Sequence, residues 1–406
     1  MNILLSSYSF GAGRGSEAGV GWNVAKGLAL RGHTVTVLTT SEFSTGNCSA
    51  IEQEELNITL IEEDCGISDF PEPGSYRKWQ RRVRSFLRNL ANTQAFDLIH
   101  HITLNQYRWV HDVFSTGTPY IIGPVGGAEL IPPHLLKYGD LPLRMRIKEH
   151  LRSFALDAIP LKNRCLRCHQ PGMILTSNDA TAERLSSTPV QSLVCPAIAI
   201  AKSEIVHHPA NNAGEKRFIL FDGSLTRPQK GTLLALRTLA ALWQKGCRVT
   251  MRMVALTPPE INTIRKYAEK LRLPAEALEL SEYVHRDTML QYMSEAAVML
   301  SCTFRDSGCM ALLEALARGC RIVCLDIPSQ KWLPEQFCHK VAVQPTSSAM
   351  EEALASALQQ EIAAPAYTEE WHKNRVQWIE QNMTWDARLD TFEELYRQIL
   401  SKKPSA

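Results

Sequence analysis

Residues 297–326 read AVMLSCTFRDSGCMALLEALARGCRIVCLD, and they reveal more about the fold than any other stretch of the chain. An apolar run at each end predicts a strand, and the alanine- and leucine-rich part between the two runs predicts a helix. A short polar loop joins the first strand to the helix. Strand, loop, helix and strand in this order form the repeating unit of a parallel sheet.

Two carboxylates flank this loop, because Asp306 lies just before the helix and Glu314 lies inside it. Backbone N–H groups at a helix start favour a phosphate or another electron-rich oxygen. Glu314 stands among alanines and leucines, so its carboxylate is expected to be partly desolvated and to need a partner. This arrangement suits a ligand with an anionic middle and hydroxyls at both ends, such as a nucleotide-diphosphate sugar. The structural alternative is that both acids only complement the helix dipole or form surface ion pairs.

Length and composition are those of an ordinary soluble protein with two or three domains. The chain has 406 residues, of which 45% are hydrophobic and 21% charged, and its net charge of +2 gives no reason to expect nucleic acid as a partner. The start, MNILLSSYSFGAGRG, lacks the basic region of a signal peptide. No window approaches the roughly 18 apolar residues that span a bilayer.

Eleven cysteines without an export signal predict reduced thiols in the cytoplasm. The sequence CLRCH at residues 165–169 formally matches a haem-attachment pattern and half of a zinc site. No second ligand pair lies nearby, so we expect no metal and interpret these thiols as buried or incidental.

Two series of apolar runs, each interrupted by helical stretches, predict two parallel sheets covered on both faces. The first series comprises residues 2–7, 34–39, 58–61, 98–102, 120–125 and 173–176, with a first helix at 17–30. The second comprises residues 218–221, 248–254, 278–284, 298–302, 321–325 and 341–343, followed by a helical tail over 351–400. Between the series, residues 197–215 gain Pro, Asn and Gly, which is typical of a linker. The predicted fold class is α/β, with two Rossmann-like domains facing across a cleft.

Residues 75–94, SYRKWQRRVRSFLRNLANTQ, carry six basic residues and no acid. Apolar residues recur in this segment at helical spacing and predict a basic amphipathic helix. Such a helix can lie on an anionic membrane surface, which would make the protein peripheral at the inner face of the membrane. The alternative is that the helix covers a sheet and exposes a solvated basic face.

Five motifs follow one another along the chain, each at a predicted strand-to-helix junction. They are SFGAGRGSEAGVGWNVAKGLALRGHTVTVLTT (9–40), FDLIHHITLNQYRW (96–109), TPYIIGPVGGAE (118–129), FDGSLTRPQKG (221–231) and FRDSGCMALLEALARGC (304–320). Together they resemble the motifs of retaining glycosyltransferase family 4, whose members use nucleotide sugars and have the GT-B architecture. The resemblance runs through most of both predicted domains.

The resemblance implies a role for several residues of the second domain. Lys230 would bind the donor diphosphate, Asp306 the sugar hydroxyls and Glu314 the ribose hydroxyls. A cation at Lys230 would neutralise the charge that develops on the leaving nucleotide. Further donor-binding residues implied by the resemblance are Gly13, Gly15, Ser16, Ser224, Arg227, Ser307, Gly308 and Cys309. Gly126, Gly127 and Glu129 would lie on the acceptor side, and His100 and His101 join Asp306 and Lys230 as catalytic candidates.

Three positions depart from the family pattern. Ser224 stands where a basic residue is usual, and Arg227 is the nearest replacement. Asp306 stands where Glu is usual, which shortens the side chain by one methylene. Ile102 occupies a position where many members carry His, and His100 and His101 lie beside it.

The resemblance implies transfer of a hexose-type sugar, with retained configuration, to a hydroxyl of a polysaccharide or lipid-linked glycan precursor. No metal or other cofactor is required, and no protein nucleophile stands out. Residues 1–200, completed by a final helix at 385–406, would bind the acceptor, and residues 201–384 would bind the donor. Closure of the domains would exclude water.

Two alternatives from other classes stay open. The chain could be a nucleotide-sugar-binding protein without turnover, because a fold does not fix a function. It could also be an NAD-dependent oxidoreductase, since Gly11-x-Gly13-x-x-Ser16 approximates the dinucleotide fingerprint and Glu42 could meet a ribose.

Overall fold

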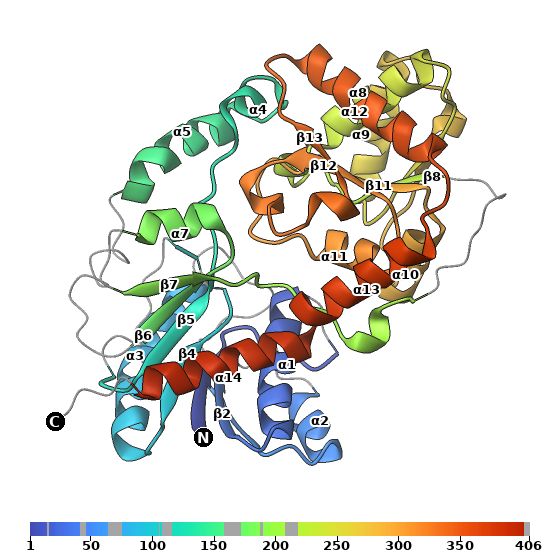
Figure 1. Cartoon of the computed structure of the whole chain (residues 1–406). Coiled ribbons are helices and arrows are strands. Elements are labelled where there is room, and N and C mark those ends of the chain that lie inside the picture. The colour runs from blue at the N-terminus through green and yellow to red at the C-terminus, as the bar shows by residue number, and fades with distance from the viewer. Residues whose placement is uncertain are drawn as a thin grey trace. The chain divides into compact units, whose positions relative to one another are not determined.

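The computed structural model describes residues 1–13, 16–40, 46–63, 75–104, 106–107, 116–157, 172–186, 190–207 and 218–401. Gly15, Glu42 and the CLRCH sequence lie outside these residues. The chain divides into two compact units (Figure 1). The first unit is Met1–Ala128, Ala155–Ala199 and Met383–Ala406, and the second is Glu129–Phe154 and Ile200–Asn382.

The first unit is built on a parallel sheet of seven strands in the order β3-β2-β1-β4-β5-β6-β7. The strands are β1 (Asn2–Ser6), β2 (Thr34–Thr39), β3 (Ile58–Glu62), β4 (Leu98–His101), β5 (Tyr120–Val125), β6 (Gly172–Thr176) and β7 (Gln191–Val194). All six strands predicted for this half are confirmed. The sequence did not predict β7, because this edge strand is short and mostly exposed and therefore lacks a continuous apolar run.

The second unit is built on a parallel sheet of six strands in the order β10-β9-β8-β11-β12-β13. The strands are β8 (Phe218–Phe221), β9 (Thr250–Met253), β10 (Leu278–Leu280), β11 (Val298–Ser301), β12 (Ile322–Asp326) and β13 (His339–Ala342). The predicted strands at 248–254 and 278–284 are present but shorter. The predicted fold class, two Rossmann-like parallel sheets, is confirmed.

Helices lie between most pairs of consecutive strands. Those up to residue 185 are α1 (Ser16–Leu30), α2 (Asn47–Gln53), α3 (Ser75–Thr93), α4 (Pro133–Tyr138), α5 (Leu143–Asp157) and α7 (Asp179–Leu185). Those that follow are α8 (Thr232–Gln244), α9 (Pro258–Lys270), α10 (Arg286–Glu295), α11 (Met310–Ala317), α12 (Ser347–Ala363), α13 (Glu369–Asn382) and α14 (Trp385–Ser401). Short 3-10 helices cover Lys202–Glu204 (η3) and Pro228–Lys230 (η4).

Both sheets reverse their strand order at one point, between β1 and β4 in the first unit and between β8 and β11 in the second. In open parallel sheets, ligands bind at the carboxyl ends of the strands beside such a reversal. The segments that follow β8 and β11 are the ones that contain Lys230 and Asp306. The topology alone therefore places both predicted residues at a ligand-binding position.

The last helix, α14, returns to the first unit and packs along α1 (Figure 1). Gly27 allows this close approach, because a Cβ atom at this position would lie 2.2 Å from a methyl group of Leu389. Arg31 Nη1 lies 2.7 Å from a carboxylate oxygen of Asp390, and His33 Nε2 lies 2.6 Å from Glu393. Apolar packing and ion pairs together fix α14 on α1.

The basic helix α3 covers the first sheet with its apolar side. Trp79, Val83, Leu87 and Leu90 are all buried, whereas basic residues of the same helix are exposed. The membrane interpretation of residues 75–94 therefore needs correction, because this helix has no exposed apolar face to insert into lipid. The sheet-covering alternative holds. No helix among the described residues is long and apolar enough to cross a bilayer.

Candidate functional site

A lysine and two carboxylates meet where the strand order of the second sheet reverses. Asp222 directly follows β8, Lys230 ends η4, and Asp306 lies in the loop after β11. Lys230 Nζ lies 3.5 Å from Asp222 Oδ2 and 3.6 Å from Asp306 Oδ2. The sequence predicted Lys230 and Asp306 but missed Asp222, although this residue follows an apolar strand and precedes a glycine.

Gly231 brings these groups together. Its φ of 72° lies in the left-handed region, which glycine adopts without strain. A Cβ atom at this position would lie only 2.3 Å from the backbone oxygen of Cys302. The backbone N–H of Phe304 donates to the carbonyl of Gln229 over 2.8 Å, which ties the two loops together. Because the loops touch, Lys230 reaches Asp306.

The opposite charges in this cluster stabilise one another. Burial by itself would lower the pKa of Lys230, but the charges around it, those of Asp222 and Asp306 among them, outweigh burial, and the pKa is raised. Burial raises the pKa of the Cys309 thiol to about 12, even though Lys230 opposes this shift. Cys309 is therefore a neutral thiol at pH 7. The ammonium group at Lys230 is balanced there by the two carboxylates.

Asp306 also orders the loop that precedes α11. Its Oδ1 accepts hydrogen bonds from the backbone N–H groups of Ser307 and Gly308, over 2.8 and 3.3 Å, while Oδ2 faces Lys230. Two of the backbone amides that were predicted to meet phosphate or sugar thus donate their hydrogen bonds to Asp306 in this structure. Any ligand at these amides has to compete with the Asp306 carboxylate.

Glu314 has the partner that its apolar surroundings require. Arg286, the first residue of α10, places Nη2 2.6 Å from Glu314 Oε1 and 2.6 Å from Glu204 Oε1. Burial raises the pKa of Glu314, although Arg286 counteracts this effect, and the charges of Glu204 and Asp222 raise it further. The charge of Asp222 thus affects both Glu314 and Lys230. The sequence did not reveal Arg286, because its contact with Glu314 is purely tertiary.

Ser224 and Arg227 are placed differently from each other. The buried Ser224 donates its hydroxyl to Glu260 Oε1 over 2.6 Å, and the backbone N–H of Thr226 donates to the same oxygen over 3.0 Å. Ser224 therefore holds its loop against the start of α9. Arg227 is exposed at the start of η4, and its charge opposes the raised pKa of Lys230.

The two candidate histidines are buried in the first unit. His100 Nδ1 lies 2.7 Å from the Tyr396 hydroxyl and its Nε2 lies 2.9 Å from the carbonyl of Gly123. His101 Nδ1 lies 2.8 Å from Ser6 Oγ and its Nε2 lies 2.6 Å from the Tyr76 hydroxyl. Since both nitrogens of each ring are bonded to the protein, the geometry favours structural roles over the predicted catalytic ones.

Gly13, Gly126 and Gly127 lie in loops that follow strands. Gly13 has a φ of 65° in the loop after β1, and Ser16 begins α1. Gly127, with a φ of 94°, follows β5, and the carbonyl of Gly126 accepts a hydrogen bond from Tyr107 N over 2.7 Å. Glu129 is buried and groups with the second unit. The acceptor-side assignment stays a prediction.

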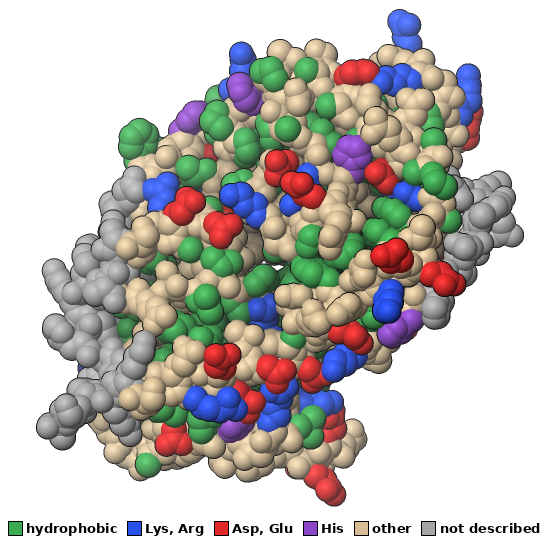
Figure 2. Space-filling view, in the orientation of Figure 1, with side chains coloured by type: hydrophobic (Ala, Val, Ile, Leu, Met, Phe, Trp, Pro, Cys, Tyr) green, Lys and Arg blue, Asp and Glu red, His purple; other side chains and the backbone are tan. Residues whose placement is uncertain are grey.

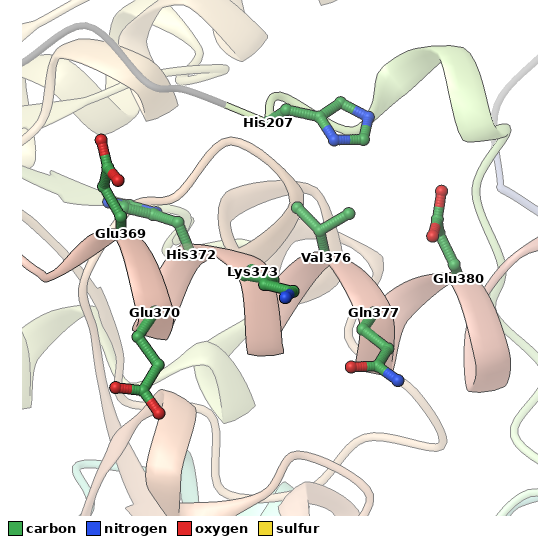
Figure 3. Close-up of a pocket in the computed structure, with 8 residues that line it drawn as sticks. All are labelled: His207, Glu369, Glu370, His372, Lys373, Val376, Gln377 and Glu380. Carbon is green, nitrogen blue, oxygen red and sulfur yellow. The ribbon is translucent and has the colours of Figure 1, made fainter.

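A cavity of about 870 Å³ lies elsewhere in the second unit, along α13. It is lined by His207, Glu369, Glu370, His372, Lys373, Val376, Gln377 and Glu380. Figure 3 shows His207 opposite the helix, with Val376 pointing toward it and with Glu370 and Gln377 pointing away. The residues predicted to bind the donor do not line this cavity. Within the described part of the chain, no group of three or more His, Cys, Asp or Glu residues could hold a metal ion.

Comparisons with known proteins agree with this architecture. Residues 216–361 match the family model described as glycosyl transferases group 1. No curated protein matches the sequence. Sucrose-phosphate synthase from Thermosynechococcus elongatus is 15% identical with a TM-score of 0.68, over 98% of this chain and 99% of that one.

Two further solved structures are similar along their whole length. A glycosyltransferase from Rickettsia africae is 14% identical with a TM-score of 0.65, over 99% of both chains. Anabaena HepE, solved in complex with UDP and glucose, is 14% identical with a TM-score of 0.60, over 98% of this chain and 99% of that one. At these identities the likeness shows the fold. The chain thus has two Rossmann-like units of the GT-B architecture, and residues 216–361 of the second match the group 1 glycosyl transferases.

Proposed function

We propose that this protein is a retaining glycosyltransferase that moves a hexose-type sugar from a nucleotide-diphosphate sugar to a hydroxyl acceptor. The observation that carries the proposal is the position of Lys230 between Asp222 and Asp306, where the strand order of the second sheet reverses. This position lies within the segment that matches the group 1 glycosyl transferases.

Each charged residue of the site has a role in this proposal. A diphosphate bound beside Lys230 would share its ammonium group with the two carboxylates, and the cation would stabilise charge on the leaving nucleotide. Asp306 would accept hydrogen bonds from sugar hydroxyls. Glu314, whose Oε1 is bonded to Arg286, would offer its other oxygen to the ribose hydroxyls.

Metal-independent transfer with retained configuration remains part of the proposal, as the sequence resemblance implied. The leaving diphosphate would accept the proton of the attacking hydroxyl on the same face of the sugar. The acceptor would be a hydroxyl of a polysaccharide or lipid-linked glycan precursor, and the protein would act in the cytoplasm. The complex of HepE with UDP and glucose makes UDP-glucose the first donor to test.

A panel of UDP-, GDP- and ADP-sugars tests the proposal. Thermal shift identifies the donor that binds, and release of the nucleoside diphosphate, with and without glycan acceptors, measures turnover. Lys230→Met and Glu314→Gln should each lower turnover at least about 100-fold, because each removes charge aimed at the donor. Lys266→Met, at an exposed lysine of α9, is the matched control. Wild-type turnover in both site variants, with the fold intact, would refute the assignment.

One observation favours a second candidate, a nucleotide-sugar-binding protein without turnover. Ser224 stands where the family pattern has a basic residue, and it offers no charge to a phosphate. Its hydroxyl already donates to Glu260. Stabilisation by a nucleotide sugar without release of nucleoside diphosphate, across all donors and acceptors tried, would support this candidate. Binding of NADH but of no nucleotide sugar would instead support the oxidoreductase alternative.

A further inference from the structure

Helix α5 exposes a continuous apolar stripe. Leu143, Ile147, Leu151 and Phe154 retain exposed fractions of 70%, 50%, 60% and 79%. Because an α-helix turns once every 3.6 residues, these four side chains lie along one side of it. The other large hydrophobic residues that are exposed, Leu30, Leu193, Val194 and Tyr283, do not form such a stripe on one helix. A contiguous exposed apolar surface indicates an interaction site.

The opposite side of α5 is anchored, so the helix cannot rotate to bury this stripe. Glu149 is buried, and its Oε1 lies 3.1 Å from Arg305 Nη2. Met145 packs against the core of the second unit, and Leu156 is fully buried. The ion pair joins α5 to the loop that contains Asp306.

Basic residues flank the stripe on both sides. Helical periodicity places Arg144 and Lys148 along one edge, and Arg146 and His150 along the other. Between residues 143 and 154 the sequence contains a single acid, Glu149, and this residue points inward. Figure 2 shows one face of the molecule, on which hydrophobic side chains lie among charged ones of both signs. The exposed side of α5 is thus apolar along its centre, with the cations of Arg144, Arg146 and Lys148 beside it.

We propose that α5 docks this protein on the surface of an anionic lipid bilayer. Apolar side chains along the centre and cations along both edges allow a helix to lie in the plane of the membrane. The apolar side chains then enter the acyl boundary and the cations contact acidic headgroups. The helix α3 has the positive charge without the exposed apolar residues, whereas α5 has both. The proposal is independent of glycosyl transfer, because binding to lipid requires no turnover.

Flotation of the full-length protein with lipid vesicles tests the proposal. Wild-type protein should float with vesicles of phosphatidylcholine and phosphatidylglycerol, bind phosphatidylcholine alone much more weakly, and lose affinity as salt screens the headgroups. Leu151→Gln combined with Phe154→Gln should reduce the bound fraction at least about tenfold, because binding scales with the apolar area inserted. Both positions are exposed, so the fold should be preserved. Leu30→Gln is the matched control and should bind as wild type does.

A second pair of variants tests the charges and distinguishes the two basic helices. Arg144→Gln combined with Lys148→Gln on α5 should weaken binding to anionic vesicles, whereas Lys78→Gln combined with Arg81→Gln on α3 should not. No flotation of wild-type protein, or equal flotation of the Leu151/Phe154 variant, would overturn the proposal. Sedimentation velocity tests the alternative that a second copy of the chain covers the stripe. A wild-type dimer that the Leu151/Phe154 substitutions convert to a monomer would assign the stripe to a second copy of the chain instead of lipid.

Discussion

At the scale of single residues, His100 shows how burial decides what a titratable group can do. Burial lowers its pKa to about 4, although the bond to the Gly123 carbonyl acts in the opposite direction. The ring is therefore neutral at pH 7. With Nε2–H donating to Gly123 and Nδ1 accepting from Tyr396, His100 joins β4, β5 and α14 inside the first unit.

We predict that His100→Ala destabilises the protein by about 2–4 kcal/mol, because it leaves a cavity and removes the partner of the buried Tyr396 hydroxyl. Urea unfolding at pH 7 measures the change, with the exposed His134→Ala as control. The pKa of His100 in the folded protein lies below the unfolded value of 6.5, so the unfolded chain takes up the proton first. The free energy of unfolding should therefore decrease as the pH falls from 6.5 toward 4. Unchanged stability together with lost turnover would return His100 to the catalytic candidates.

At the scale of elements, Glu260 links the loop after β8 to the start of α9. Its Oε2 accepts hydrogen bonds from the backbone N–H of Thr257, over 2.9 Å, and from the Thr257 hydroxyl, over 2.8 Å. Its Oε1 accepts from Ser224 and Thr226. Burial would raise the pKa of this carboxyl, but the four hydrogen bonds outweigh burial and lower it to about 2. One side chain thus caps a helix and orders the loop that leads to Lys230.

We predict that Glu260 contributes stability above pH 4.5 and loses it as the pH falls toward 2, because protonation breaks these hydrogen bonds. A shift from 4.5 to about 2 corresponds to on the order of 3 kcal/mol. Urea unfolding at a series of pH values should show a flatter acid limb for Glu260→Gln than for wild type. Glu269→Gln, at an exposed position of α9, should keep the wild-type slope. Parallel slopes for wild type and Glu260→Gln would contradict the assignment.

At the scale of the whole molecule, two separate hydrophobic cores stabilise the chain. The core of the second unit is formed by residues between Ile219 and Leu358, together with Ile131, Leu135 and Leu141 in and beside α4. The core of the first unit combines β1, β2 and α1 with Leu389, Phe392, Leu395, Tyr396 and Ile399 of α14. The first unit is therefore complete only when the last helix has packed on it.

We predict that Leu389→Ala destabilises the first unit by about 3 kcal/mol, because it opens a cavity where α14 packs against Gly27. Hydrogen exchange should lose protection in β1, β2 and β4, while β8, β11 and β12 keep theirs. Glu394→Ala, at an exposed position of the same helix, should change neither set. Equal loss of protection in both sheets would show that the two units unfold as one.

The sequence alone was enough to predict the parallel sheets, every described strand except β7, and the placement of Lys230 and Asp306 after β8 and β11. These features depend on local patterns of apolar, glycine and turn residues, and such patterns can be read directly along the sequence. It also indicated that Glu314 needs a partner, because a carboxylate among apolar residues has to be compensated.

The tertiary structure was needed to show which residue pairs with Glu314 and which amphipathic helix keeps its apolar face exposed. Arg286 and Asp222 join the site through contacts between separate elements, and no local pattern specifies such contacts. The sequences of α3 and α5 both carry apolar residues at helical spacing with basic residues beside them. The sheet buries the apolar side of α3, whereas Glu149 and Arg305 hold α5 with its stripe in solvent. Burial is a property of the assembled fold, and the sequence pattern of one helix cannot reveal which of its sides the rest of the chain will cover.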